Sequence, residues 1–137
     1  MLNTLATLFD SGRALFSVRY LLFEGDPEFI TAVELSFESI KAVFRAEPDF
    51  DTLAANIGSL ETAPDETIFD ASHLQPWHRF MGLQFSFAWQ MTNQQGYTDG
   101  VRFDFDGQTG QPSIIEMVVY ASAIRIYTSE QIPRGKS

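Results

Sequence analysis

Hydrophobic and polar positions alternate with a period of two along most of this chain, which is typical of β-strands with one buried face. Residues 1–9 are the exception, because their leucines recur at helical spacing and predict a short amphipathic helix that ends at Asp10-Ser11-Gly12. In residues 14–23 every even position is apolar, so we expect a long strand with one buried face. Glu24-Gly25-Asp26-Pro27 predicts the turn that ends it.

The apolar positions change parity once between residues 29 and 46. They are odd-numbered over 33–37 and even-numbered over 40–44, which requires a tight turn or a bulge near Ser39, because side chains alternate between the two faces of a strand. Residues 52–57 predict a weaker strand, although their alanines also suit a helix.

Turns and irregular segments come next. Pro48-Asp49 predicts a turn, and the polar stretch 58–72 predicts a long surface loop. Residues 76–80 predict one helical turn, since proline is tolerated at the start of a helix.

The chain from residue 83 onward predicts a succession of antiparallel strands, because short hairpin signals separate strongly alternating segments. The expected elements are a strand at 83–92, a hairpin loop at 93–100, a strand at 101–105, a second hairpin at 106–112, a strand or strand pair at 114–127 bent at 121–123, and a frayed tail at 133–137.

These elements predict a mainly antiparallel β protein, α+β only through its minor helix. We expect one domain over residues 1–137, built as a single twisted meander sheet, open or curved into a half-barrel, with a short N-terminal helix. The predicted core contains Phe85, Phe87, Trp89, Phe103, Phe105, Val33, Leu35 and Phe37. The aromatic row on the strand at 83–92 lacks interleaved basic residues, so we assign it to the core rather than to base stacking.

The charge balance excludes some partners. Nine Lys and Arg stand against eighteen Asp and Glu, a net charge of −9. Nucleic-acid binders and proteins of anionic membrane surfaces normally have the opposite balance, so we expect neither partner. A basic protein would be attracted.

Acidic residues are concentrated between residues 47 and 70, where no Lys or Arg occurs. The segment contains Glu47, Asp49, Asp51, Glu61, Asp65, Glu66 and Asp70. It is either a docking face for a basic partner or a solvated loop, and the sequence leaves both open.

The chain contains no cysteine, which excludes disulfides, thiolate catalysis and iron–sulfur clusters. The N-terminus does not have the pattern of a signal peptide, and no apolar run approaches the roughly 18 residues of a membrane span. We therefore expect a cytoplasmic protein that does not contact membranes.

The candidate metal sites are weak. His73 and His78 are five residues apart with Pro76 between them, whereas paired zinc histidines on a helix are four apart. Asp104-Phe105-Asp106-Gly107 begins like a calcium loop, but the glycine comes too early. We predict no metal and no cofactor.

Four carboxylates lie opposite the apolar positions of their strands, namely Glu34, Glu38, Asp104 and Glu116. If a curved sheet brought these faces together, the carboxylates would line a polar cleft suited to acid–base chemistry. If not, they are ordinary solvated residues. Sequence motifs of serine hydrolases, P-loop proteins and dinucleotide-binding folds are lacking.

The segment 91–100 is the most distinctive in the chain, and together with shorter motifs it resembles a family of small uncharacterised bacterial proteins. In that family a Trp and a Gly precede a strand, a Gly-Tyr-x-Asp hairpin follows, and a strand with a Ser-Ala-Ile-like end closes the chain. The other matching positions are Asp49, Asp51, Pro76, Trp77, Gly82 and 121–124. The resemblance covers most of residues 29–127. It implies a compact α+β or mainly β cytoplasmic protein, and it implies no particular activity. The chain is also similar in size and acidity to toxin-immunity proteins.

We interpret the chain as a non-enzymatic protein-interaction module, with an immunity-like role as one version. Two alternatives stay open: a small-ligand binder or small enzyme that uses a polar cleft on the second sheet face, and a structural homodimer. The sequence assigns no catalytic residue. The candidate protein-binding residues are Asp49, Asp51, Asp65, Glu66, Trp77, Tyr97 and Asp99.

Overall fold

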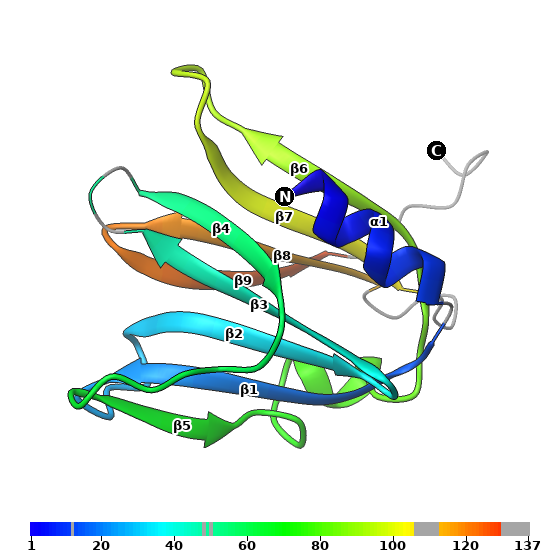
Figure 1. Cartoon of the computed structure of the whole chain (residues 1–137), viewed down its shortest axis with the longest axis horizontal. Helices are drawn as coiled ribbons and strands as arrows, with labels where there is room; N and C mark the ends of the chain where they lie inside the picture. The colour runs from blue at the N-terminus through cyan, green and yellow to red at the C-terminus, as the bar shows by residue number, and fades with distance from the viewer. Residues whose placement is uncertain (12, 48, 50, 106–112, 130–137) are drawn as a thin grey trace.

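The computed structural model describes residues 1–11, 13–47, 49, 51–105 and 113–129. Its elements are α1 (Leu2–Ser11), β1 (Leu15–Phe23), β2 (Ile30–Phe37), β3 (Ile40–Glu47), β4 (Thr52–Ile57), β5 (Glu66–Asp70), the 3₁₀ turn η1 (Trp77–Phe80), β6 (Phe85–Thr92), β7 (Thr98–Phe105), β8 (Ile114–Tyr120) and β9 (Ala123–Ser129). The mainly antiparallel β architecture with a short N-terminal helix is confirmed (Figure 1). The uncertain segment 52–57 is a strand, and the parity change near Ser39 is the β2–β3 turn.

The strands form two antiparallel sheets that meet at one point. The first sheet has the order β5-β1-β2-β3-β4, and the second has the order β9-β8-β7-β6. One bridge pair, Ile30 with Ile124, joins β2 to β9. In the part of the chain that the structure describes, the strands do not close into a barrel. The pairing of β5 with β1 was not predicted, because the segment between β4 and β6 has no strong alternation.

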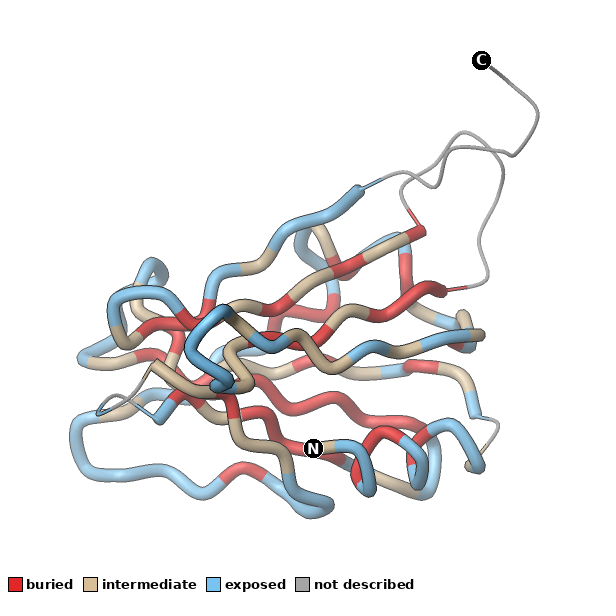
Figure 2. The backbone as a smooth tube through the Cα atoms, turned by 90° about the horizontal axis from the view of Figure 1, so that it is seen from above, coloured by how far each residue is buried: buried red, intermediate tan, exposed pale blue. Residues whose placement is uncertain are grey.

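The main core lies between the two sheets. Phe44 of β3 meets Phe103 of β7 edge-on at 5.8 Å between ring centroids, and Phe37 meets Phe85 at the same distance. Figure 2 shows long buried stretches in the interior of the molecule, and in β2 every residue except Thr31 is buried. One side of each sheet lies in this shared aromatic core, where each buried aromatic side chain contributes about 2–3 kcal/mol.

Helix α1 covers the side of the molecule where β4 and β6 are the sheet edges. It contacts β6, β3 and β4, and its buried residues are Thr4, Leu5 and Leu8. The Thr4 hydroxyl donates to the backbone carbonyl of Ala55 on β4 at 3.3 Å. The helix thus covers the core between β4 and β6 (Figure 1).

The predicted facing of β6 is wrong beyond its first residue. Phe85 is buried, but Phe87 is 61% exposed and Trp89 is 43% exposed. The pairing with β7 shifts register between Phe85 and Phe87. A bulge inserts one extra residue and so reverses which face the later side chains take. The predicted core therefore loses these two aromatic residues, and Ala88 packs against the core instead.

The predicted facing of β1 is also wrong at Phe16, because the strand has a similar register shift. Its pairing with β2 is irregular between Leu15 and Ser17, and Phe16 is exposed although it occupies an apolar even position. Leu21 is completely buried on the opposite face from Val18. Around Leu21, strand β1 is therefore covered on both faces, which simple alternation did not predict.

The predicted surface loop 58–72 is more ordered than its composition indicated. Residues 58–65, which we call the strap, cross the outer face of the first sheet, and residues 66–70 form β5. Leu60 of the strap is buried with Leu21, Ala32 and Val43 in a second, smaller core. The cover arises from a single leucine in a polar segment, so no periodic signal indicated it.

Several predicted features lie outside the described residues. They are the helix end at Gly12, the turn proline Pro48, the hairpin at 106–112 and the tail at 133–137. Among the residues that are described, no helix has the length and apolar character needed to cross a membrane.

Candidate functional site

The outer face of the first sheet contains a buried ion pair. Arg19 of β1 and Glu34 of β2 are cross-strand neighbours, joined by two hydrogen bonds, Nε to Oε1 at 2.8 Å and Nη2 to Oε2 at 3.0 Å. The amide of Leu60 donates to Oε2 of Glu34 at 2.9 Å. The Glu34 side chain is 1% exposed. The pair therefore holds the strap against the sheet, so we call this surface the covered face.

The protonation of Glu34 follows from these bonds. Burial by itself would raise its pKa. The hydrogen bonds from Arg19 and from the Leu60 amide, with the charges of Arg19 and Lys41, outweigh burial and lower the pKa of Glu34 below its ordinary value. Glu34 is therefore an ionised carboxylate with its acceptors occupied, and not a group poised to take up a proton near neutral pH.

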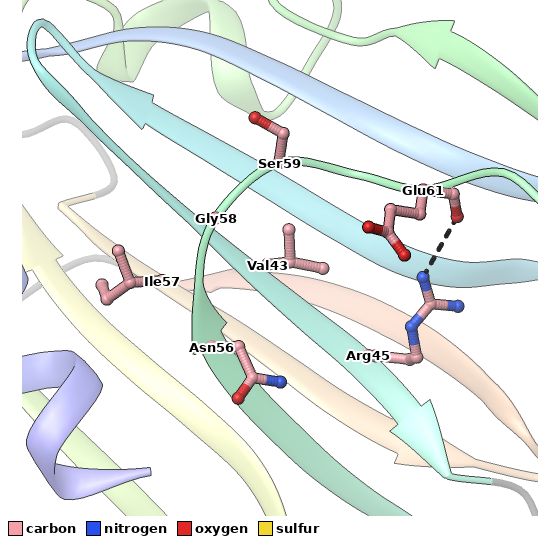
Figure 3. A pocket seen from close by; sticks show the side chains of 7 residues that line it. All are labelled: Val43, Arg45, Asn56, Ile57, Gly58, Ser59 and Glu61. Carbon is pink, nitrogen blue, oxygen red and sulfur yellow. Dashed lines mark hydrogen bonds between the residues drawn. The ribbon is translucent and has the colours of Figure 1, made fainter.

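A shallow pocket lies where the strap leaves β4. It has a volume of about 210 Å³ and is lined by Val43, Arg45, Asn56, Ile57, Gly58, Ser59 and Glu61 (Figure 3). The Arg45 guanidinium donates to the carbonyl of Glu61 at 3.4 Å and lies 3.9 Å from the Glu66 carboxylate. Ligand pockets usually enclose roughly 300–1,000 Å³. The pocket can accept a small polar group, but its one cation is already bound by the strap.

Among the described residues, no segment crosses the outer face of the second sheet, which has several exposed aromatic side chains, and we call it the open face. Cross-strand register aligns Trp89, Arg102, Glu116 and Tyr127 in one row across the four strands. Phe87 lies in the next row and Tyr120 at the end of β8. The exposed aromatic residues are Phe87 (61%), Trp89 (43%), Tyr120 (67%) and Tyr127 (53%). The rings of Phe87 and Trp89 stack on each other, and Arg102, Glu116 and Arg125 lie between them and the two tyrosines, so the surface is mixed aromatic and charged.

Cations already lie on the rings of the open face. The Arg102 guanidinium is 5.7 Å from the centroid of the Trp89 ring, and its Nε donates to Glu116 at 2.8 Å. Arg125 lies at the same distance from the ring of Tyr120. The face therefore presents aromatic surface and polar groups together, which is the composition enriched at the centres of protein interfaces.

Gly100 permits close packing on the open face. A Cβ at this position would lie 2.8 Å from the carbonyl oxygen of Met117 and 3.3 Å from the sulfur of Met91. The glycine therefore lets Met91 and Val118 approach each other across β7, and the aromatic surface continues between its rows.

The predicted acidic residues are separated into different environments. Asp51 accepts a hydrogen bond from the amide of Ser122 at 2.9 Å, which fastens the β3–β4 turn to the β8–β9 turn. Asp49 is exposed in the same turn. Asp65 is exposed at the end of the strap, where its carbonyl accepts from the Glu24 amide. The Glu66 side chain is 9% exposed and is bonded to Thr31.

The three remaining predicted residues also lie apart. Trp77 is completely buried in the core and donates from Nε1 to the hydroxyl of Tyr20, so its ring is not part of the surface. Tyr97 is 43% exposed in the β6–β7 hairpin, and Asp99 lies two residues further along, in β7. Of the seven predicted residues, Trp77 is therefore the one that is removed from any surface patch.

An acidic end nevertheless exists, assembled from segments that are distant in sequence. Antiparallel register places the β1–β2, β3–β4, β6–β7 and β8–β9 turns and the start of β5 at the same end of the molecule (Figure 1). The acids at this end are Glu24, Asp26, Glu28, Glu47, Asp49, Asp51, Asp65, Glu66 and Asp99. The turns themselves contain no Lys or Arg. Glu61 and Asp70 of the predicted acidic segment lie elsewhere, on the strap and at the far end of β5.

The four carboxylates proposed for a polar cleft do not converge. Glu34 lies on the covered face, Asp104 and Glu116 lie on the side of the second sheet that faces away from the core, and Glu38 pairs with Arg13 at 3.4 Å in an exposed turn. Within the described ranges, no group of three or more His, Asp or Glu side chains is placed to hold a metal ion.

The open face was missed because its residues resemble core residues in the sequence. Phe87 and Trp89 continue the alternation that begins at Phe85, and only the bulge turns them outward. Tyr120 and Tyr127 were available as a signal, since each follows an apolar residue that packs in or against the core, and each takes the opposite face. A tyrosine on the solvent side of two adjacent strands is a residue that sequence reasoning could have selected.

Comparison with known proteins places the chain in a family but assigns no activity. No curated protein matches this sequence, and no solved structure matches it. A family model described as a family of unknown function, DUF6334, matches residues 3–133, which is nearly the whole chain. The resemblance to an uncharacterised family is thereby confirmed at the level of the family, and this chain belongs to DUF6334.

Proposed function

We propose that this chain is a non-enzymatic protein-interaction module and that the open face is its docking surface for another protein. The observation that carries the proposal is the exposure of Phe87, Trp89, Tyr120 and Tyr127 on one side of the second sheet. Exposed aromatic residues scattered singly would need no explanation, but four on one sheet face are unusual.

The contrast between the two outer faces supports this assignment. On the first sheet the strap covers the surface, and Leu60 completes a small core there. On the second sheet the described chain supplies no equivalent segment over Trp89 and Tyr127, whose exposure stays near one half. A partner that covers this surface would remove apolar area from water at about 25 cal/mol per Å².

The chemistry of the open face also supports protein binding. Tyr, Trp and Arg are the residues that most often dominate the binding energy of protein interfaces, and all three occur in the row that contains Trp89, Arg102 and Tyr127. The hydrogen bond between Arg102 of β7 and Glu116 of β8 restrains these two side chains of the row before a partner arrives.

The proposal is tested by site-specific photo-crosslinking in the source cell. A photoreactive phenylalanine analogue replaces Tyr127 on the open face, and in a matched control it replaces Phe16, which is 55% exposed on the first sheet. We expect a discrete crosslinked protein from Tyr127 and not from Phe16. The identified protein, purified, should bind wild type and lose binding to Phe87→Ser/Trp89→Ser.

Three outcomes would overturn the proposal. The first is the same crosslinks from both positions, which would indicate random collision. The second is crosslinks between two copies of this chain only, which would indicate a homodimer. The third is full binding of the partner to the Phe87→Ser/Trp89→Ser variant when circular dichroism shows that it is folded.

A further inference from the structure

We infer that the partner of the open face is a basic protein whose positive groups lie over the acidic end. This inference rests on the proposed function and adds the chemical class of the partner. It follows from the size of the open face, from the charges that border it and from the chemistry of its rings.

The size of the open face requires a partner that extends beyond it. Four strands at about 4.8 Å spacing and about seven residues at 3.4 Å each span roughly 450 Å². A specific complex typically buries about 800 Å² on each partner. A stable partner must therefore also contact a neighbouring surface of this chain.

The acidic end is a neighbouring surface of this kind. The β8–β9 turn begins directly after Tyr120 of the open face, and the Ser122 amide of that turn is bonded to Asp51. Exposed Asp49 lies in the same acidic turn, and Tyr97 and Asp99 follow at the end of the β6–β7 hairpin. A partner that extends from the rings past this edge meets carboxylates, so charge complementarity requires it to be positive there.

The rings of the open face favour the same chemistry. Two of them already have guanidinium groups at 5.7 Å, Trp89 with Arg102 and Tyr120 with Arg125. The negative faces of aromatic rings attract cations, with Arg the more frequent donor. Arginine or lysine side chains of a partner would find the same surface on exposed Tyr127 and Phe87.

A second copy of this chain fits the open face less well. A symmetric dimer formed by this face alone would rest on a flat footprint of roughly 450 Å² on each copy, a small base for a stable interface. Each copy also carries a net charge of −9, so the two acidic bodies would repel each other at low salt. A larger basic partner can contact more than the open face, and its charge is attracted rather than repelled.

The test uses a random-peptide display library as the probe. Peptides are selected on wild-type protein at low salt, counter-selected on Phe87→Ser/Trp89→Ser, and then sequenced, synthesised and titrated. We expect the enriched peptides to combine aromatic or aliphatic residues with an excess of Lys and Arg. Their association rate should fall about ten-fold or more between about 50 mM and 300 mM salt.

A matched pair of charge reversals locates the effect. Glu28→Lys/Asp49→Lys changes two exposed acids at the acidic end, and Asp10→Lys/Glu38→Lys changes two exposed acids at the opposite end by the same charge. We expect the first variant to weaken peptide binding about ten-fold and the second to leave it within about two-fold.

The two ideas fail in different ways. Peptides that are neutral or acidic, or equal effects of the two charge reversals, would overturn the inference while the open face remains a docking surface. A selection that enriches no peptide dependent on Phe87 and Trp89 would overturn both.

Discussion

The covered face and the open face contain the same kind of ion pair in different surroundings. Arg19–Glu34 and Arg102–Glu116 are both cross-strand pairs with Nε–Oε1 distances of 2.8 Å. The carboxylate side chain is 1% exposed in the first pair and 22% exposed in the second. The first pair also receives the Leu60 amide. The difference between them is the strap, which crosses one sheet and has no described counterpart on the other.

This comparison separates structural from functional use of similar residues. On the covered face, the Glu34 carboxylate and the apolar residues around Leu60 are satisfied within the chain, so they stabilise the fold. On the open face, the four aromatic side chains are 43–67% exposed, so they contribute less to folding than fully buried rings would. An apolar surface that does not stabilise the fold is available to stabilise a complex.

The largest expected effect is from removing Glu34. Glu34→Ala leaves the Arg19 guanidinium and the Leu60 amide without their acceptor, and breaking a buried pair costs about 3–5 kcal/mol. Glu116→Ala removes the equivalent partner from an exposed pair, so we expect about 1 kcal/mol or less. Urea unfolding measures both variants. Equal losses would show that the strap does not distinguish the two faces.

A smaller difference is expected for apolar truncations. Leu60→Ala opens the small core under the strap and should lower the free energy of unfolding by about 2 kcal/mol. Phe87→Ala removes a larger side chain that is 61% exposed, so its effect should stay below about 1 kcal/mol. Thermal unfolding compares the two. A greater loss from Phe87→Ala would mean that this ring is a core residue after all.

The first sheet should also respond to alkaline pH, through Tyr20 of β1, which packs against the main core. Burial raises the pKa of Tyr20 to about 12, while the hydrogen bond from Trp77 lowers it by less. The ordinary value is 10.0, so above pH 10 the unfolded chain releases this proton before the folded chain does. The stabilisation is therefore present below pH 10 and is lost as pH rises through about 12.

The variant Tyr20→Phe, which lacks the titrating hydroxyl, is compared with wild type to test this pH effect. The variant should lose some stability at neutral pH, because the buried Trp77 indole keeps no acceptor from Tyr20. Its stability should then decline less than that of wild type between pH 10 and 12. Parallel declines of the two proteins in urea titrations would contradict the shifted pKa of Tyr20.

The smallest expected effect involves no change in stability. The two tryptophans report separately on core and open face, since Trp77 is 0% exposed and Trp89 is 43% exposed. Acrylamide should quench the Trp89 emission and leave that of Trp77. In Trp89→Phe the remaining emission should be blue-shifted and resistant to quenching. Emission that is still readily quenched in this variant would place Trp77 near solvent.

The sequence by itself determined most of the secondary structure and the class of fold. Period-two alternation located the strands, and turn residues separated them, because a half-buried strand needs this pattern to place one face in a core. The parity change near Ser39 became the β2–β3 turn, and the bend at 121–123 became the β8–β9 turn. The expected membership of an uncharacterised family is confirmed by the family model over residues 3–133.

Only the tertiary structure decided which faces are covered. The bulge after Phe85 turns the later side chains of β6 to the opposite faces, because one inserted residue exchanges the two faces. The alternation of residues in the sequence does not reveal this bulge. The strap is held by the Leu60 side chain and by hydrogen bonds to Glu34 and Arg45, which lie far from it in sequence. The acidic end depends on the register between strands that are also far apart in sequence. Local patterns specify local structure, whereas burial and surface charge depend on which distant segments come together, and this decided that Trp77 is core and Trp89 is surface.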